Sequence, residues 1–360
     1  MWRYKELLPI EDTSKIVTLN EGETALWKST GLAKVLGLRN LYLKDETKNP
    51  TWSFKDRGTS VGVSKAREIG YQIVGCVSSG NMAASISTYA AHAGLRALVL
   101  LRTGVPIEKI VHMLICGAEV IAVDMPYPRI YRLGLELSKE CGICWVHADA
   151  PMRIEGQKTS SFEICEQLGW EVPGKVVVPT SSGGNMSAHW KGWRDMYATK
   201  LIEEKPSMVA VQIAAAHPIY DAFRQGKDIV QPVVEGDTIA TSICNPDPPS
   251  GLRVLRLLRE SKGLVEVVDD DEILQAQKLL GRTEGIFAEP GGSSSIAGLK
   301  KLVDHGSIDR DETVVAVITG AGIKDTKSAI KVAGKPYTVS FESELRDLIA
   351  TLFRKSEELH

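Results

Sequence analysis

Short apolar runs of strand length alternate with stretches of helical period through most of the chain, and this alternation constrains the fold more than any other feature. Strands joined by crossover helices form parallel sheets. The pattern therefore predicts an α/β fold with open, mostly parallel, twisted sheets and helices on both faces. The expected strands are residues 41–44, 73–78, 97–101, 119–123, 144–147, 176–179, 208–213 and 313–319, and the main expected helices are residues 55–69, 82–93, 106–116, 128–141, 157–168, 186–197, 269–281 and 294–303.

The spacing of these elements also predicts how the chain divides. Four strand–turn–helix units follow one another between residues 70 and 150, with further strands on both sides. We therefore expect a smaller, mobile domain at residues 57–150, inserted into a larger one formed by residues 1–56 and 151–334. A ligand cleft is expected between them, at the carboxyl ends of the strands. Residues 335–360 form a more polar tail with a short amphipathic helix near residues 342–354.

Composition narrows the class of partner. Apolar residues make up 43% of the chain and charged residues 24%, and the formal net charge is -2. These values are ordinary for a soluble globular protein, and no basic block marks a nucleic-acid or membrane partner, so a small-molecule ligand is expected. The first fifteen residues lack the apolar core of a secretory signal, and the apolar stretch 110–123 is too short to span a bilayer, which favours a cytoplasmic location.

Six cysteines are scattered along the chain without the dense spacing of a disulfide framework. Cys141 and Cys144 match C-x-x-C, but no second pair lies at zinc-ribbon spacing. Half-buried apolar cysteines are the favoured interpretation of this pair, and a redox or metal role is the less favoured one. No metal site is expected.

The segment NPTWSFKDRG at residues 49–58 follows a strand and opens a helix, which places Lys55 in the first helical turn. The helix N-terminus disfavours a further positive charge there, and Trp52 and Phe54 partly exclude water from the amine. A lysine so placed has a lowered pKa and attacks an aldehyde readily. Taken alone, however, an ordinary solvated lysine at a helix start explains the segment better.

Two further loops follow strands and open helices. Asn81, just after Gly80, is positioned to donate its amide to a phenolate-like oxygen, although helix capping by itself explains the residue better. In the loop at residues 178–187, the pair Gly183 and Gly184 lets backbone N–H groups converge on an anion, with Ser181 and Ser182 as additional donors. The competing explanation of that loop is an ordinary Gly-rich turn.

A fourth loop begins at Thr319, the last residue of an apolar strand. Its hydroxyl is suited to hydrogen-bond a pyridine nitrogen, although an ordinary strand-end turn explains it equally well. Together the four loops supply what pyridoxal 5'-phosphate (PLP) requires: an amine for the aldehyde, an amide for the ring hydroxyl, a cradle for the phosphate and a partner for the ring nitrogen. The combination therefore predicts a PLP site.

Six segments of the chain resemble the threonine synthases. They are NPTxSFKDRG at 49–58, SGN at 79–81, RIEGQKT at 153–159, GGN at 183–185, RTEGIFxEP at 282–290 and TGxGIKD at 319–325, and the similarity runs in order over residues 2–330. The resemblance implies a two-domain PLP enzyme of fold type II, the structural type of tryptophan synthase β, usually as a homodimer. It also implies a carbon–oxygen lyase of amino-acid biosynthesis that converts O-phospho-L-homoserine and water to L-threonine and phosphate.

The same resemblance implies roles for individual residues. Lys55 would be the catalytic residue, which binds the cofactor as a Schiff base and moves protons at the substrate's carbons. Phe54 would pack near the ring, Asn81 would meet the ring hydroxyl, and Thr319 the ring nitrogen. The cofactor phosphate would lie on Ser181, Ser182, Gly183, Gly184 and Asn185. The substrate would be held by Ser78, Ser79 and Gly80 at its carboxylate, and by Arg153 and Asn185 at its phosphate.

The sequence departs from the threonine synthases mainly on the substrate side. Those enzymes usually have Asn-Ser where His147-Ala148 stands, Gly-Asn where Ser181-Ser182 stands and glycine where Trp52 stands, and an IRIGNP stretch is shortened around Cys244. Each lost charged or hydroxyl partner of a buried phosphate costs ~1.5 to 3 kcal/mol, enough to change substrate preference. His147 and Lys158 are candidates to compensate.

Two alternatives therefore stay open. One is β-replacement or β-elimination on phosphoserine, serine or threonine, as in cysteate synthases and dehydratases of the same fold. The other is a non-catalytic paralogue that binds an amino acid or a protein partner.

Overall fold

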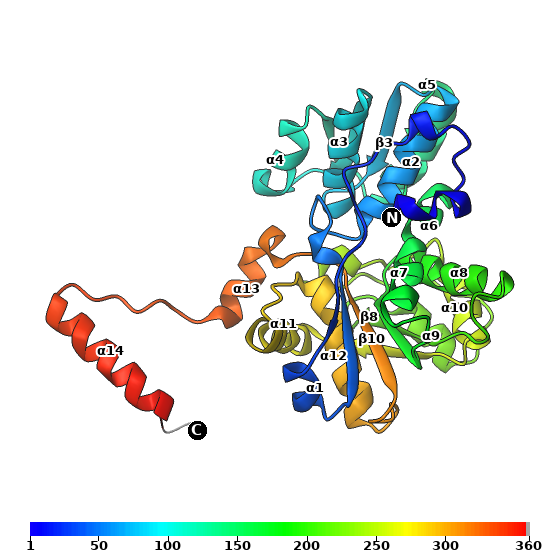
Figure 1. The fold of residues 1–360 in the computed structure, drawn as a ribbon. Coiled ribbons are helices and arrows are strands. Elements are labelled where there is room, and N and C mark those ends of the chain that lie inside the picture. The colour runs from blue at the N-terminus through cyan, green and yellow to red at the C-terminus, as the bar shows by residue number, and fades with distance from the viewer. Residues whose placement is uncertain (358–360) are drawn as a thin grey trace.

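The chain forms two sheets, one above the other in Figure 1, and the computed structural model describes the backbone of residues 1–357 and the side chains of residues 1–352. The larger sheet has the order β1-β2-β10-β7-β8-β9 and the smaller one β5-β4-β3-β6. All neighbouring strands are parallel except β1 and β2. The strands are β1 (Leu26–Lys28), β2 (Asn40–Asp45), β3 (Ile73–Val77), β4 (Arg96–Arg102), β5 (Glu119–Val123), β6 (Cys144–Trp145), β7 (Lys175–Pro179), β8 (Ser207–Ile213), β9 (Leu264–Val268) and β10 (Thr313–Ile318).

Helices connect the strands and pack around both sheets (Figure 1). They are α1 (Gly31–Leu36), α2 (Lys55–Ile69), α3 (Asn81–Ala93), α4 (Ile107–Ile115), α5 (Tyr127–Cys141), α6 (Pro151–Gln157), α7 (Thr159–Gln167), α8 (Gly184–Ala198), α9 (Pro218–Arg224), α10 (Gly251–Glu260), α11 (Asp270–Glu284), α12 (Pro290–Asp304), α13 (Thr326–Ala333) and α14 (Glu342–Glu357). The α/β class with mostly parallel sheets and surrounding helices is thus confirmed.

Element boundaries differ from expectation in several places. Strands β1 and β9 and helices α1, α9, α10 and α13 were not among the expected elements. The helix expected at residues 157–168 is present as α7, which begins at Thr159, whereas the separate helix α6 before it was not expected. The strand expected at residues 144–147 is only the two-residue β6, so His147 already lies in the loop beyond it.

The core of the larger sheet explains why its central strands are almost wholly apolar. Strands β7, β8 and β10 are buried on both faces, since one hydrophobic cluster covers each side of the sheet. A third cluster fills the space around the smaller sheet and includes Val17 from the N-terminal segment as well as Val63 and Ala66 of α2. Buried parallel strands of this kind give a rigid edge on which loops can be placed.

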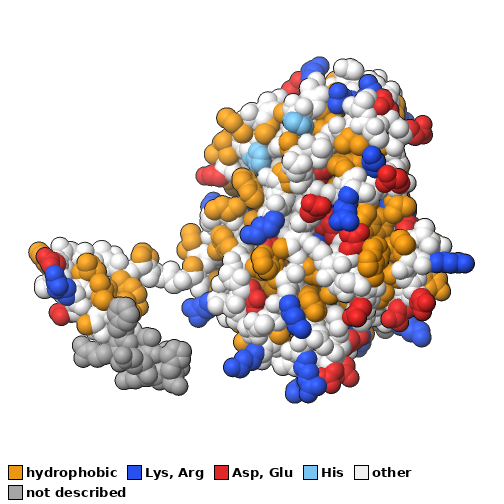
Figure 2. Space-filling view, viewed as in Figure 1, with side chains coloured by type: hydrophobic (Ala, Val, Ile, Leu, Met, Phe, Trp, Pro, Cys, Tyr) orange, Lys and Arg blue, Asp and Glu red, His pale blue; other side chains and the backbone are white. Residues whose placement is uncertain are grey.

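The surface of the body carries charges of both signs, and the C-terminal helix lies away from it. Figure 2 shows acidic and basic side chains interspersed over the visible face of the body, without a large area of one sign. Helix α14 lies apart from the body at the end of an extended connection (Figure 1). Within the described part of the chain, we find no helix with the length and hydrophobicity needed to cross a membrane.

Candidate active site

Lys55 is the first residue of α2, as the sequence predicts. The loop before it is fastened to the end of β10, because Phe54 N donates to Thr319 O at 3.0 Å and Ser53 pairs with Gly320. The Lys55 amine lies 4.2 Å from the centroid of the Phe54 ring. Three of the predicted cofactor residues, from segments 264 positions apart in the chain, therefore come together at one edge of the larger sheet.

The surroundings of Lys55 favour the neutral amine. Burial, and after it the positive charges of Arg153 and Lys324, lower the pKa of Lys55 to about 7. The carboxylate of Glu289 acts in the opposite direction. A substantial fraction of this amine is thus unprotonated near neutral pH, which is the form that attacks an aldehyde.

Asp56, the next residue, ties the start of α2 to its neighbours. Its carboxylate accepts hydrogen bonds from Thr51 N at 2.7 Å, Thr51 Oγ1 at 2.6 Å and Ser85 Oγ at 2.6 Å. Ser85 belongs to α3, so Asp56 joins the lysine loop to the helix that begins at Asn81. The carboxylate is structural, and it fixes the direction in which α2 starts.

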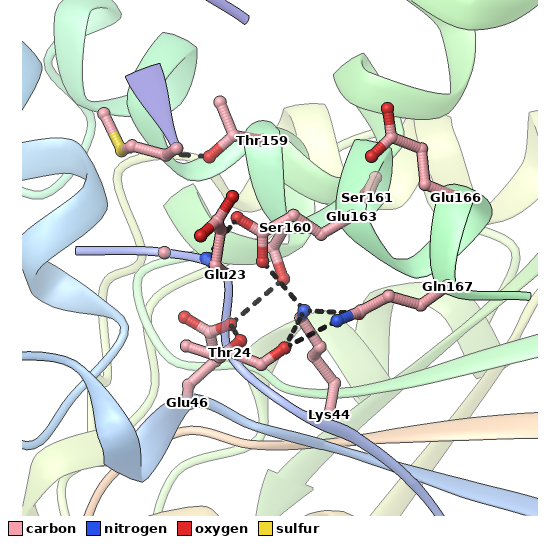
Figure 3. Close-up of polar contacts among 12 residues, drawn as sticks. Glu23, Thr24, Lys44, Glu46, Thr159, Ser160, Ser161, Glu163, Glu166 and Gln167 are labelled. Carbon is pink, nitrogen blue, oxygen red and sulfur yellow. Dashed lines mark hydrogen bonds and ion pairs between the residues drawn. The ribbon is translucent and has the colours of Figure 1, made fainter. Parts of the chain in front are cut away.

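Arg57 anchors the same helical turn through a fully buried ion network. Its guanidinium donates to Glu46, with Nε at 2.7 Å, and to Glu163, with Nη1 and Nη2 both at 2.6 Å. Lys44 Nζ also donates to Glu163 at 2.8 Å, to Thr24 O at 2.7 Å and to Gln167 Oε1 at 2.8 Å (Figure 3). Two cations therefore balance two carboxylates, which is the condition for burying charge.

Asn81 does not cap a helix, so the competing explanation of this residue is wrong. It is the first residue of α3, whose N-cap is Gly80. The Asn81 amide nitrogen instead lies 2.9 Å from each carboxylate oxygen of Glu289. This contact joins the loop after β3 in the smaller sheet to the start of α12 on the larger one, so the carboxyl edges of the two sheets meet here.

The Gly-rich loop after β7 has the shape of an anion cradle. Gly183 has φ +87°, and α8 starts at Gly184 without a side-chain cap, which leaves its first N–H groups for an anion. A Cβ atom on Gly184 would lie 2.4 Å from Ala148 O, so only glycine fits. Ser182 Oγ accepts a hydrogen bond from Asn245 at 2.7 Å, and the buried Asn185 Nδ2 has no partner among the described residues.

Arg153 is the most unusual side chain of the site. It is fully buried on α6, yet none of its three side-chain nitrogens has a hydrogen-bond partner in the described part of the chain. Burial lowers the pKa of Arg153 to about 10. A buried guanidinium without a partner is costly, so its position indicates an anionic ligand.

The predicted carboxylate-binding residues form the turn between β3 and α3. Ser78 N donates to Leu100 O at 3.0 Å, and Gly80 N donates to Ser78 Oγ at 3.2 Å. Ser78 and Ser79 are half-buried and Gly80 is exposed. The structure therefore brings this turn next to Asn81, whereas no hydrogen bond joins it to Arg153 or Asn185 within the residues described.

The residues that depart from the threonine synthases have partners of their own. Trp52 is a half-exposed residue with φ +62°, a conformation that favours glycine, and its ring centroid lies 5.9 Å from that of His112. His147 Nδ1 lies 2.6 Å from Asp149 Oδ1 and 3.1 Å from Tyr131 OH. Lys158 is paired with Glu155 and Asp195, so it is not free to compensate for a lost phosphate partner.

The cysteines take no part in this arrangement. All six are free thiols; Cys141 is exposed, whereas Cys144 and Cys244 are half-buried. Burial raises the pKa of Cys244 to about 11.

Comparison with known proteins gives the class of this fold and site. A family profile described as "Pyridoxal-phosphate dependent enzyme" matches residues 17–320. The threonine synthase of Methanocaldococcus jannaschii is 46% identical over 341 residues, covering 94% of this chain and 84% of the relative, and that of Methanosarcina acetivorans is 41% identical over 340 residues with the same coverage. The processed form of threonine deaminase isoform 2 from Solanum lycopersicum has the same fold, with a TM-score of 0.73 at 21% identity, covering 92% of this chain and 93% of that one.

The chain therefore belongs to the pyridoxal-phosphate dependent enzymes and, among them, to the threonine synthases. PLP is its cofactor, and the residues present fit that group. Lys55 offers an amine with a lowered pKa, and the loop at Gly183 and Gly184 offers an uncapped helix N-terminus with the unpartnered Asn185 amide beside it.

The sequence did not reveal three residues that shape the site. Glu289, Glu163 and Lys324 act on Lys55, Arg57 and Asn81 from distant parts of the chain. Glu289 and Lys324 did stand inside two of the segments that resemble the threonine synthases. Their position in these segments was the available signal. An ionisable residue that is buried near a functional site needs a charged or hydrogen-bonding partner.

Proposed function

We propose that this chain converts O-phospho-L-homoserine and water to L-threonine and phosphate. The observation that carries the proposal is Arg153, a buried guanidinium with three unpartnered nitrogens. An arginine presents two parallel donors that match the oxygens of a phosphate monoester. The threonine synthases among the relatives supply the reaction type.

Arg153 and Asn185 are the residues that we assign to the substrate's phosphate. Both are placed by rigid helices, α6 and α8, and both have side-chain donors without partners among the described residues. A dianionic phosphate between them would gain charge-assisted hydrogen bonds and would neutralise the buried guanidinium. The turn of Ser78, Ser79 and Gly80 then offers its hydroxyls and the start of α3 to the substrate's carboxylate.

We assign each of the remaining site residues to a different part of the cofactor. Bound PLP delocalises the electron pair that is left when a carbon of the substrate loses its proton. Lys55 Nζ takes and returns that proton, for which a pKa near 7 is well matched. Phe54 covers the amine, Asn81 is placed for the ring hydroxyl and Thr319 for the ring nitrogen, while Ser181, Ser182 and the two glycines after them receive the cofactor's phosphate.

Three wider properties belong to the same proposal. Residues 57–150 form a small domain that closes over the substrate and excludes water until phosphate has left. The enzyme acts as a homodimer, and it acts in the cytoplasm. All four strands of the smaller sheet lie in that segment, which supports the first property.

Phosphate release from O-phospho-L-homoserine tests the proposal. The purified enzyme with PLP should release phosphate and form threonine, and Arg153→Met should lose this activity while it keeps the near-visible absorbance of the lysine-bound cofactor. Arg194→Met, on the exposed side of α8, is the matched control and should keep full activity. No phosphate release by an enzyme with an intact spectrum would contradict the assigned substrate.

A second candidate reaction is β-elimination or β-replacement on phosphoserine, serine or threonine. It is favoured by His147, which lies in the loop after β6 where threonine synthases usually have a polar pair, and which contacts Asp149 of the same loop and Tyr131 of α5. We infer that the larger ring at this position favours a shorter substrate. Turnover on phosphoserine, serine and threonine that exceeds turnover on O-phospho-L-homoserine would favour this reaction instead.

A further inference from the structure

Glu289 is a buried carboxylate to which the proposed reaction assigns no role. It is the residue before α12, and its side chain is 7% exposed. Its backbone N–H donates to Gly320 O at 2.9 Å, directly beyond the predicted ring-nitrogen partner Thr319. The carboxylate therefore lies at the junction of the lysine loop, the β10 loop and α3.

Both oxygens of Glu289 are engaged by the amide of Asn81, each at 2.9 Å from the nitrogen. A third and weaker contact comes from Ser242 Oγ at 3.5 Å. The backbone leaves little freedom for this carboxylate, because a Cβ atom on Gly320 would lie 2.6 Å from its Oε1 and 3.2 Å from Asn81 Nδ2. Only glycine at position 320 permits this arrangement.

Burial and the neighbouring groups act on the pKa of Glu289 in opposite directions. Burial raises the pKa of Glu289, whereas the Asn81 hydrogen bonds and the charges of Lys324 and Lys55 favour its ionised form. Ionised Glu289 in turn favours the ammonium form of Lys55. Arg153 and Lys324 act on Lys55 in the opposite sense, and Asp56 acts on Lys324. Among the charges of the described structure that act on Lys55, Glu289 supplies a carboxylate opposite the cations Arg153 and Lys324.

We propose that Glu289 is a positioning residue, which holds one N–H of the Asn81 amide across the two sheets so that the other is presented to the cofactor's ring hydroxyl, and which supplies a negative charge that acts on Lys55. The inference rests on the proposed function, because it needs Lys55 as the cofactor lysine. The two carboxylate oxygens subtend a much smaller angle at the Asn81 nitrogen than the one between its two N–H bonds, so one N–H is shared between both oxygens and the other remains available for the ring hydroxyl.

The pH dependence of Lys55 labelling tests this role without any turnover. The cofactor-free full-length enzyme is mixed briefly with PLP between pH 5.5 and 9 in a series of buffers and reduced with borohydride. The label on the Lys55 peptide is then measured by mass spectrometry. Labelling follows the neutral fraction of the amine, so its midpoint reports the pKa of Lys55.

Glu289→Gln should lower this midpoint by about one pH unit or more, because an opposite charge that favoured the ammonium form is gone. Gly320→Ala should shift it in the same direction by a smaller amount, since the new methyl group displaces the carboxylate. Glu136→Gln, at an exposed carboxylate of α5, is the matched control and should leave the midpoint unchanged.

The outcomes separate this inference from the proposed function. An unchanged or raised midpoint in Glu289→Gln overturns the role of Glu289, and if that variant does not fold, an unchanged midpoint in Gly320→Ala overturns it instead. Absence of label on Lys55 in the unmodified enzyme would instead overturn the proposed function, and the role of Glu289 with it. A lowered midpoint in either variant, with the control unchanged, supports the inference.

Discussion

Arg153 and Lys55 are two cations that repel each other in a region from which water is largely removed. Burial, and to a smaller extent the charge of Arg153, lower the pKa of Lys55 to about 7, so the lysine relieves the repulsion by losing its proton. The guanidinium does not titrate in this way near neutral pH, so it remains charged and unpartnered. A buried guanidinium without a hydrogen-bond partner is unfavourable for the folded chain, and we expect an anion that binds it to remove this cost.

Replacement of Arg153 should consequently stabilise the cofactor-free enzyme while it removes activity. Arg153→Met is expected to raise the free energy of unfolding by about 1 to 4 kcal/mol, because a buried charge without a partner becomes an apolar side chain of similar length. Urea denaturation of the cofactor-free protein measures the change. The exposed Arg194→Met should alter stability by less than about 0.5 kcal/mol, and a destabilised Arg153→Met protein would contradict the argument.

The effect of the buried His189 ring on the stability of the fold depends on pH. The ring is buried, with Nδ1 3.0 Å from Ser161 Oγ, and burial lowers the pKa of His189 from 6.5 to about 4. In the unfolded chain the ring takes up a proton below about pH 6.5, whereas in the folded chain it does so only near pH 4. Stability is thus complete above pH 6.5 and falls progressively as the pH decreases towards 4.

This fall should reach about 3 kcal/mol at pH 4 if His189 alone is responsible. His189→Gln removes the titrating ring, so the free energy of unfolding should decrease less steeply between pH 6.5 and 4 than it does in the unmodified protein. Urea denaturation at a series of pH values gives both curves. His92→Gln, at an exposed position of α3, should leave the slope unchanged, and equal slopes in all three proteins would refute the assignment.

At the scale of elements, the first turn of α2 depends on charges from four segments. Arg57 of α2 meets Glu46 next to β2 and Glu163 of α7, and Lys44 of β2 completes the neutral set. Removal of one cation leaves a buried carboxylate without adequate compensation, which is far more costly than the loss of a surface pair. The network therefore fixes the position of Lys55, two residues before Arg57.

Arg57→Met should destabilise the protein by about 3 to 5 kcal/mol. The matched control is Arg3→Met, since Arg3 is 55% exposed and pairs with Glu166 at the surface, and it should cost at most about 1 kcal/mol. The midpoints of urea unfolding compare the two. Similar midpoints for both variants would mean that the buried network does not anchor α2.

Sequence periodicity predicted those elements that are long and strongly patterned, and missed those that are not. Strands β7, β8 and β10 stand out because burial on both faces makes them continuous apolar runs. Strand β1 has only three residues and is mostly exposed, and β9 carries Glu266 in its middle, so neither gives such a signal. The position of Lys55 was predictable from a local signal, the strand-to-helix turn.

The partners of the site residues were not predictable in the same way. Arg57 and Glu163 are 106 positions apart, and Asn81 and Glu289 are 208 apart. No local pattern records which distant carboxylate will meet a given donor, because the choice is made when helices pack on sheets. The departures at Trp52 and His147 were visible in the sequence, whereas their contacts with His112 and Asp149 required the structure.

At the scale of the whole molecule, the functional loops and the C-terminal helix are separate. The loops lie where the two sheets meet, and the Asn81–Glu289 contact joins them. Helix α14 is distant from that junction in Figure 1, and hydrophobic side chains lie along it in Figure 2. Phe341, Leu345 and Ile349 repeat every four residues and are exposed, so they form an apolar stripe on one side of the helix.

A chain that ends after Gly334 should therefore keep the stability of the body and the chemistry of Lys55. The described residues of the deleted part belong to none of the hydrophobic clusters that form the core of the body. We expect the free energy of unfolding to change by less than about 1 kcal/mol and the absorbance of lysine-bound PLP to be unchanged. An isolated helix of this length is marginally stable in water, so α14 gains little from its own hydrogen bonds and little is lost with it. Loss of several kcal/mol in the truncated chain, measured by urea denaturation beside the full-length protein, would show that the apolar stripe packs on the body in solution.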